Sequence, residues 1–177
     1  DSHEGCVVPS RARAWRGARR LREAGLNTPS TVAWGETTAG LMPGSYDSLL
    51  VTAAVPNAQP VSEYFQELPA DPAPDALRLK RHLLRRLGEV AARLHGHRLR
   101  HGDMRAHNVM WQPHRGTESR LFFIDTDRVP RSLILLPRVR VKSLMQLFFL
   151  DCLAMSVTDR LRLIRAYGRA SDFGRRQ

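Results

Sequence analysis

Three polar residues in the middle of the chain have the types and the spacing of a phosphoryl-transfer site. Asp103 follows a His-Gly pair, Asn108 comes five positions later, and Asp125 ends an apolar stretch further on. In such a site the first carboxylate orients a hydroxyl group and accepts its proton, while the amide and the later carboxylate hold Mg²⁺ against the nucleotide phosphates. Because the cation lies between its ligands and the phosphates, the ligands must come from separate segments. The pattern therefore predicts binding of a nucleotide and Mg²⁺.

Two predicted elements flank these residues and would position them. Residues 77–95 predict an amphipathic helix that ends shortly before Asp103, because apolar side chains recur along it at three-to-four spacing. Residues 109–111 and 121–124 predict two short strands, with turn-forming residues between them, so that the pair forms a hairpin. The apolar stripe of the helix consists of Leu79, Leu83, Leu87, Val90 and Leu94.

The remaining sequence predicts a mixture of helices and strands. A helix is expected over residues 10–24, with Gly25 as its stop. The other expected elements are strands at 31–34 and 49–53, the second one buried, a loop at 36–48, a proline-rich connector at 56–76 with a short helix at 61–68, and helices at 139–153 and 158–167. The apolar run 133–136 would either touch a membrane surface or be buried, and we expect it to be buried.

The composition predicts one folded domain with a strongly basic surface. The 177 residues are 42% hydrophobic and carry a net charge of +11, and Lys80 and Lys142 are the only lysines among 28 basic residues. The arginines are scattered along the sequence, so both affinity for anions and ordinary solvated helix faces remain open. Cys6 and Cys152 suggest no disulfide framework. No zinc-finger, RRM-like or helix-turn-helix pattern is evident, so no specific nucleic-acid partner is expected.

The same residues resemble the protein-kinase-like superfamily and, more closely, the lipopolysaccharide kinase group of Kdo and heptose kinases. The resemblance depends on His101-Gly102-Asp103 with Asn108 and on the run Ile124-Asp125-Thr126-Asp127-Arg128. Weaker support comes from stretches at 15–21, 25–29, 49–52 and 159–167. It implies an α+β, protein-kinase-like fold with a reduced N-lobe at residues 1–55 and a mostly helical C-lobe at residues 56–177.

The resemblance also implies roles for individual residues. Asp103 would be the catalytic base, and Arg105 would be a catalytic cation beside the transferring phosphoryl group. Asn108 and Asp125 would bind the cofactor through Mg²⁺. His101 would brace the loop, Asp127 would be a weaker acidic neighbour of the metal, and residues 49–53 would line the adenine slot.

By the same resemblance, the reaction would be ATP-dependent transfer of the γ-phosphoryl group to a sugar hydroxyl, with the lipopolysaccharide inner core as acceptor. The expected partners are a nucleotide and an anionic glycolipid or a small hydroxylated substrate. The expected location is the cytoplasm, with peripheral contact at the cytoplasmic face of the inner membrane. The alternatives are a small-molecule kinase of the aminoglycoside or choline type and a catalytically silent, pseudokinase-like binding module.

Three features expected of a kinase N-lobe do not occur in this sequence. No GxGxxG precedes the first predicted helix, and no lysine precedes Lys80, which lies on the helix before the catalytic loop. Ala14 stands where the family places a glutamate. Two explanations are open: a truncated chain, which the start at Asp1 favours, and a degenerate kinase, which Ala14 favours. The intact set of base and metal ligands argues against decay.

Overall fold

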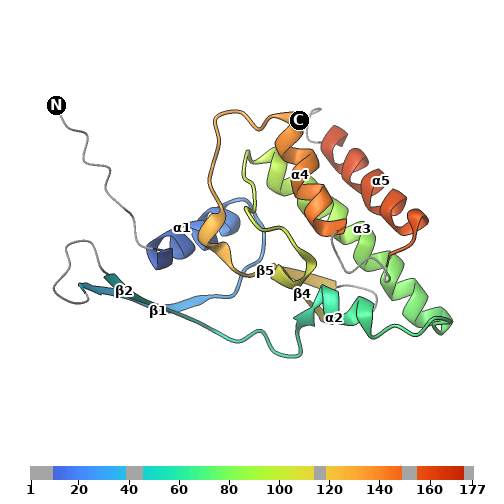
Figure 1. Cartoon of the computed structure of the whole chain (residues 1–177), viewed down its shortest axis with the longest axis horizontal. Coiled ribbons are helices and arrows are strands. Elements are labelled where there is room, and N and C mark those ends of the chain that lie inside the picture. Colours follow the sequence, from blue (N-terminus) through green and yellow to red (C-terminus); the bar gives the residue numbers. More distant parts are fainter. Residues whose placement is uncertain (1–9, 39–45, 114–118, 149–154, 174–177) are drawn as a thin grey trace.

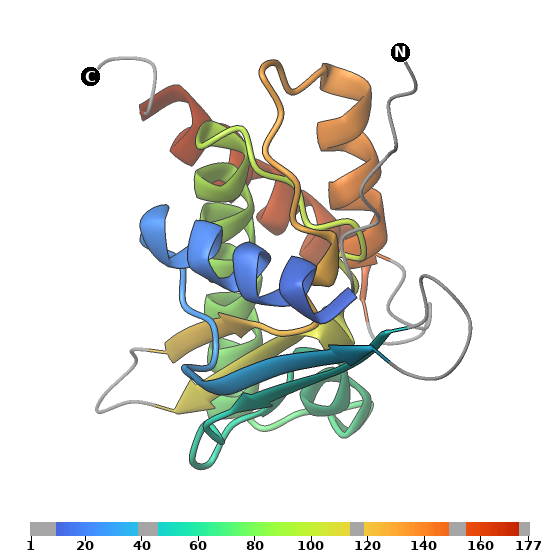
Figure 2. The same ribbon diagram turned by 90° about the vertical axis from the view of Figure 1, so that its left-hand side faces the viewer.

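The computed structural model describes residues 10–38, 46–113, 119–148 and 155–173 and shows a mixed α+β fold (Figure 1). Helix α1 (Ser10–Glu23) lies across a hairpin of strands β1 (Thr31–Thr38) and β2 (Tyr46–Thr52) (Figure 2). A second antiparallel sheet has the strand order β3–β4–β5. The remaining elements are β3 (Gln59–Pro60), α2 (Val61–Gln66), α3 (Pro74–Gly96), β4 (Val109–Pro113), β5 (Ser119–Phe123), α4 (Pro137–Phe148) and α5 (Val157–Phe173).

Helix α1 ends where the sequence predicts. Gly25 has φ +67°, the left-handed conformation that glycine adopts without steric cost. The N–H of Leu26 donates back to the carbonyl oxygen of Leu21 at 2.9 Å, and the N–H of Gly25 donates to Arg22. This Schellman-type end satisfies the last carbonyl groups and turns the chain toward β1.

The hairpin of β1 and β2 differs from the prediction in two ways. Both strands extend into the segment expected to be a loop, because Glu36 pairs with Ser48 and the ladder continues outward; residues 39–45 lie outside the described part. The strand expected to be buried is instead half open, since Leu49 is 65% exposed and Val51 is also exposed. Side chains alternate along a strand, so Leu50 lies on the inner face between these two exposed residues.

Helix α3 has the predicted apolar stripe and forms the centre of the core. Leu83, Leu87 and Leu94 are fully buried, and the helix begins earlier than expected, at Pro74. It packs closely along α5: a Cβ added to Gly88 would lie 2.5 Å from the carbonyl oxygen of Leu163. The absence of a side chain at position 88 therefore permits the two helices to approach each other.

A buried ion pair also joins α3 to α5, and sequence analysis did not predict it. Lys80 Nζ lies 2.9 Å from Asp159 Oδ2, with both side chains largely buried. Asp159 also accepts a hydrogen bond from the backbone N–H of Ser156, whose hydroxyl accepts one from the N–H of Asp159. This reciprocal capping box starts α5.

The segment before α4 corrects a prediction. Residues 133–136 were expected to be buried, but Leu133 is 89% exposed and Ile134 is 76% exposed; only Leu135 is buried. Helix α4 starts at Pro137 rather than at residue 139, and the predicted continuation beyond Phe148 lies outside the described residues. Helix α5 runs past the predicted end at residue 167.

Candidate active site

His101 joins the loop of Asp103 to the loop of Asp125. Its ring is buried between the loops, where Nε2 donates to the carbonyl oxygen of Ile124 at 2.9 Å and Nδ1 accepts from the N–H of Asp103 at 3.3 Å. Burial lowers the pKa of His101, although the carbonyl of Ile124 and the nearby carboxylates oppose this effect. A neutral ring with its proton on Nε2 therefore fits both contacts, and the bracing contact expected for His101 is present.

Asn108 closes the same loop from its other end. Its buried side chain donates from Nδ2 to the backbone carbonyl of Asp103 at 3.0 Å. Its own carbonyl accepts the N–H of Ile124 at 3.0 Å, one residue before Asp125. Asn108 therefore contacts both carboxylate-bearing segments, through its side chain on one side and its backbone on the other.

The backbone of Asp125 is in the left-handed region, with φ 53° and ψ 59°. This conformation is uncommon for a residue with a side chain and is concentrated at turns and functional sites. The residues that follow fix the turn: Thr126 Oγ1 donates to the carbonyl oxygen of Ala14 at 2.7 Å, and the carbonyl of Arg128 accepts the N–H of Gly102 at 2.6 Å. The loop is thus held from α1 on one side and from the Asp103 loop on the other.

Asp103 and Arg105 form a bidentate ion pair. Nε and NH2 of Arg105 each donate to one carboxylate oxygen of Asp103, both at 2.6 Å. These hydrogen bonds hold the pKa of Asp103 below its usual value, although partial burial of the carboxylate opposes the shift. The pKa of Arg105 is raised by Asp103 and, more weakly, by the charge of Asp125. A fixed, ionised carboxylate with an adjacent cation results.

Asp127 lies close enough to Asp125 for their charges to interact. Burial raises the pKa of Asp127, and the negative charge of Asp125 raises it further, against the opposing effect of Arg128. Two adjacent carboxylates repel each other, and a divalent cation between or beside them would relieve that repulsion. The oxygen donors of this loop, together with the side-chain amide of Asn108, therefore suit Mg²⁺.

A hollow of about 340 Å³ opens beside these carboxylates. It lies between α1, the inner face of β2 and the Asp125 loop, and its volume is within the range of small-molecule sites. Its lining consists of Ala14, Ala18, Thr28, Pro29, Leu50, Thr52, Ile124, Asp125, Thr126 and Asp127. Leu50 and Thr52 belong to the stretch that the resemblance assigns to an adenine slot.

Among the described residues, helix α1 offers the Asp125 loop arginine side chains but no carboxylate: Arg20 donates to the carbonyl of Val129 at 2.9 Å, and the charge of Arg13 acts on Asp127. At the position where the family places a glutamate, Ala14 is buried and offers its backbone carbonyl to Thr126. One turn later, a Cβ added to Gly17 would lie 1.9 Å from the carbonyl oxygen of Thr126. Sequence analysis did not assign a role to Gly17 or Thr126. Their small size on paired elements would have been the only signal.

Gln146 was also missed, because it comes from α4, 42 to 44 residues after the loop residues that it contacts. Its Oε1 accepts the N–H of Met104 at 3.1 Å, and its Nε2 donates to the carbonyl of Gly102 at 3.3 Å. A single amide thus satisfies two backbone groups on either side of Asp103. The structure brings together all four residues predicted for the site, Asp103, Arg105, Asn108 and Asp125, and adds Gln146 as a support.

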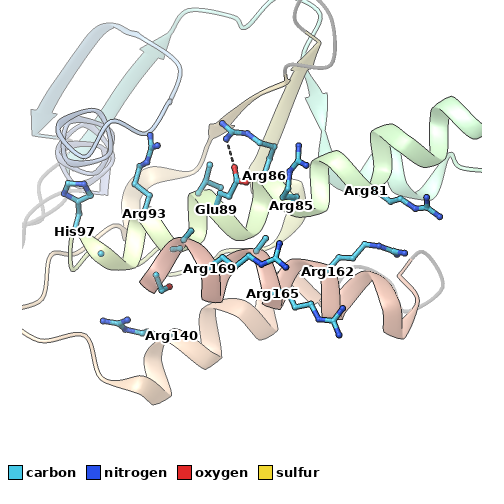
Figure 3. Close-up of a pocket in the computed structure, with 16 residues that line it drawn as sticks. Arg81, Arg85, Arg86, Glu89, Arg93, His97, Arg140, Arg162, Arg165 and Arg169 are labelled. Atoms are coloured by element: carbon cyan, nitrogen blue, oxygen red, sulfur yellow. Dashed lines mark hydrogen bonds and ion pairs between the residues drawn. The ribbon is translucent and has the colours of Figure 1, made fainter. Parts of the chain in front are cut away.

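A second and larger hollow, of about 1220 Å³, lies between α3 and α5 and shares no lining residue with the first (Figure 3). We call it the arginine groove. Its charged lining residues are Arg81, Arg85, Arg86, Glu89, Arg93, Arg140, Arg162, Arg165 and Arg169, with His97 at one end. Glu89 is the one carboxylate among the residues that line it, and it pairs with Arg86 at 2.6 Å. Arginines that are scattered in the sequence are therefore gathered by the fold.

Known proteins share this fold and about 30% of the aligned residues. A solved structure described as WaaP in complex with acyl carrier protein matches with a TM-score of 0.73 at 28% identity, over 89% of this chain and 65% of that one. The chain is 30% identical over 160 residues to the lipopolysaccharide core heptose(I) kinase WaaP of Pseudomonas aeruginosa, and 28% identical over 159 residues to that of Escherichia coli. The fold is therefore the α+β fold of a known kinase. The lipopolysaccharide kinase (Kdo/WaaP) family model matches residues 4–167, and the chain belongs to this family.

The match to the curated relatives is partial on their side. Both sequence alignments include 88% of this chain but 58% of the relative, so the chain spans less than two thirds of their length. Within the described residues, no helix combines the length and the apolar character that a bilayer crossing requires.

Proposed function

We propose that this chain carries the catalytic centre of an ATP-dependent phosphotransferase that acts on a sugar hydroxyl of the lipopolysaccharide inner core. The observation that supports this most strongly is the convergence of two loops, joined by the His101 ring, which brings the segments of Asp103, Asn108 and Asp125 together. Family membership supports kinase chemistry and ATP as the phosphoryl donor. The heptose kinase relatives support the class of acceptor.

In this proposal Asp103 is the base. Its carboxylate is ionised, since the hydrogen bonds from Arg105 lower its pKa. Gln146 supports the loop at the next residue, Met104. Asp103 would orient the acceptor hydroxyl and accept its proton as the new bond to phosphorus forms. The positive charge of Arg105 would stabilise the negative charge on the phosphoryl group during its transfer.

Asn108 and Asp125 would hold Mg²⁺, with Asp127 as a neighbour. Bound Mg²⁺ would neutralise phosphate charge at this end of the hollow. The nucleotide base would lie toward β2, against Leu50 and Thr52. This arrangement keeps the proposed division of the chain into an N-lobe at residues 1–55 and a C-lobe at residues 56–177.

No lysine among the described residues lines the hollow, and Lys80 is committed to Asp159. Arginine charges act on the site carboxylates: Arg105 acts on Asp103, together with His107, and Arg128 and Arg13 act on Asp127. In this proposal arginines therefore supply positive charge around the phosphates.

Thermal shift with ATP, with and without Mg²⁺, tests the site. We expect a Mg²⁺-dependent rise in Tm that Asp125→Asn removes, while the exposed control Asp75→Asn retains it. Asp103→Asn should keep the rise and lose phosphoryl transfer to a lipopolysaccharide-core acceptor. If no nucleotide changes the Tm, the silent binding module is supported instead. Transfer to aminoglycosides or choline without transfer to the core sugar would support the small-molecule kinase.

A further inference from the structure

Several large apolar side chains face solvent on the segment that follows the Asp125 loop. Leu133 and Ile134 form its tip, with Leu136 at the start of α4. Val141, 58% exposed, and Met145, 48% exposed, continue it along the helix. We call these five residues the apolar ridge. Monomeric soluble proteins seldom expose large apolar patches, and those that do use them for contact with a partner or a membrane.

The outward face of α4 alternates these apolar side chains with basic ones. Arg138 and Lys142 are exposed at the same helical spacing as Val141 and Met145, and Arg131 is exposed just before the tip. From residue 128 to residue 148 the sequence has five basic residues and no Asp or Glu. The ridge therefore combines an apolar tip with a uniformly positive border.

We propose that the apolar ridge rests on the surface of an anionic lipid bilayer. Apolar side chains at a membrane surface enter the boundary between headgroups and acyl chains, while long basic side chains bend toward the headgroup phosphates. An anionic leaflet attracts each such cation. The described helices are not suited to cross the membrane, so the contact lies in the plane of its surface. The positive border favours a lipid surface over an uncharged apolar protein groove.

The ridge is firmly tied to the candidate active site. On α4, Gln146 directly follows Met145 of the ridge and holds the backbone on both sides of Asp103. At the tip, Leu135 is buried and its carbonyl accepts a hydrogen bond from Arg140 at 3.4 Å. Docking of the ridge would thus set the height of Asp103 above the lipid. This inference deepens the proposed function and rests on it in one respect: a glycolipid acceptor lies in the bilayer that the ridge would contact.

Sedimentation with sucrose-loaded vesicles tests the inference without any turnover. We expect the chain to bind phosphatidylglycerol-containing vesicles and to bind pure phosphatidylcholine vesicles weakly. Leu133→Ser/Ile134→Ser should lower the partition coefficient by on the order of tenfold or more. Arg138→Gln/Lys142→Gln should lower it about thirtyfold on anionic vesicles, since each cation near the surface contributes about a fivefold factor.

Matched controls come from elsewhere on the surface. Val157→Ser/Leu161→Ser removes exposed apolar side chains from α5, and Arg22→Gln/Arg120→Gln removes exposed cations far from the ridge in sequence. Unchanged circular dichroism and Tm would show that every variant is folded. No vesicle binding, or equal losses in ridge and control variants, would overturn the inference. A ridge-dependent dimer without lipid binding would overturn it in favour of a second copy. The ATP-induced Tm shift, measured on the same samples, tests the proposed function separately.

Discussion

Arg105 donates hydrogen bonds of 2.6 Å to both carboxylate oxygens of Asp103, which lies two residues earlier on the same loop. A guanidinium fork of this kind fixes the orientation of a carboxylate as well as its charge. The pair therefore holds Asp103 as an oriented, ionised carboxylate, which the proposed base requires. In that proposal, an acceptor hydroxyl would share the carboxylate with Arg105.

Replacing Arg105 should change the acid limb of the activity profile. The hydrogen bonds of Arg105 lower the pKa of Asp103, so Arg105→Ala should raise that pKa toward its ordinary value. The base would then be protonated at higher pH, and the acid limb of kcat/KM should move upward. Loss of the cation should also reduce kcat by about 10²-fold or more, as for other charge-stabilising groups.

Arg105→Lys is the informative companion, because it keeps a charge and loses the planar fork. We expect an intermediate rate, with nucleotide binding close to that of the parent. Arg120→Ala, an exposed arginine on β5, serves as the control. An acid limb that stays in place in Arg105→Ala would show that Asp103 is not the titrating base.

Gly17 should tolerate no side chain. An added Cβ would lie 1.9 Å from the carbonyl oxygen of Thr126 and 3.2 Å from Val129 Cβ, so α1 would have to move away from the Asp125 loop. We expect Gly17→Ala to lower the free energy of unfolding by about 1–3 kcal/mol, typical of overpacking in a core. Urea denaturation would measure it.

Gly168 offers the matched control, since an added Cβ there meets nothing within 4 Å. It lies inside α5, where alanine favours the helix over glycine by about 1 kcal/mol. Gly168→Ala should therefore stabilise the protein. A Gly17→Ala variant as stable as the parent would mean that α1 does not lie against Thr126 as described.

The buried pair of Lys80 and Asp159 should be costly to break from one side. Lys80→Met leaves Asp159 with its capping contacts and with Arg162 at 2.9 Å but without its buried cation, and we expect a loss of about 1–3 kcal/mol. Burial would raise the pKa of Asp159, yet the hydrogen bonds and charge of its partners lower it overall. Its stabilising effect is therefore present above its ordinary pKa of about 4 and is lost as pH falls through the lower folded value.

Arg78 and Asp75 form the comparison pair on the exposed side of α3, at 3.0 Å. Surface pairs contribute roughly 0–1 kcal/mol, so Arg78→Ala should change stability little. Similar losses for Lys80→Met and Arg78→Ala in urea titrations would contradict a structural role for the buried pair.

His95 should make the fold sensitive to mild acid. Burial lowers its pKa from 6.5 to about 4, and the charge of Arg140 adds to this effect. Between these values the unfolded chain binds a proton that the folded chain does not, so stability falls as pH drops. The expected loss from pH 7.5 to pH 5 is about 2 kcal/mol. Denaturant titrations at several pH values would measure it.

His95→Gln should remove most of this dependence while retaining a polar partner for the hydroxyl of Tyr167, which now lies 3.0 Å from Nδ1 of His95. His97→Gln, at an exposed site two residues later, is the control and should leave the dependence unchanged. A pH profile identical in parent and His95→Gln would place the acid sensitivity elsewhere, for example at His101, whose pKa burial also lowers.

The arginine groove should respond to multivalent anions. Phosphate or sulfate that binds the folded state stabilises it by mass action, and a gain of 1 kcal/mol corresponds to about 2–4 °C in Tm for a chain of this size. Arg85→Gln/Arg165→Gln/Arg169→Gln should remove most of the rise and should raise Tm at low salt, because like charges no longer crowd the groove. Equal rises in this variant and in Arg22→Gln/Arg120→Gln would contradict a specific groove.

Local patterns in the sequence predicted the elements around the candidate site. The spacing from Asp103 to Asn108, the helix before it and the hairpin after it all depend on neighbours in the chain, so periodicity and turn residues were sufficient. The bounds of β1 and β2 were less accessible, since polar residues such as Glu36 and Ser48 pair only because the opposite strand is present.

Contacts between distant segments could not be predicted. Hydrophobic periodicity indicates that a residue faces an apolar environment, but it does not identify the element on the other side. This is why the sequence did not pair Lys80 with Asp159, and why residues 133–136 were predicted to be buried although Leu133 and Ile134 are largely exposed. Ala14 likewise seemed to be only a missing glutamate, although its carbonyl holds Thr126.

The bare backbone at Gly17 has a mechanical consequence. Because Gly17 has no side chain, the backbone of α1 packs directly against the backbone of Thr126. One turn earlier in the helix, the Thr126 hydroxyl donates a hydrogen bond to the carbonyl of Ala14. A tilt of α1 would therefore also move the turn after Asp125. A molecule that binds the outer side of α1 could therefore change the position of the Asp125 carboxylate without contacting it.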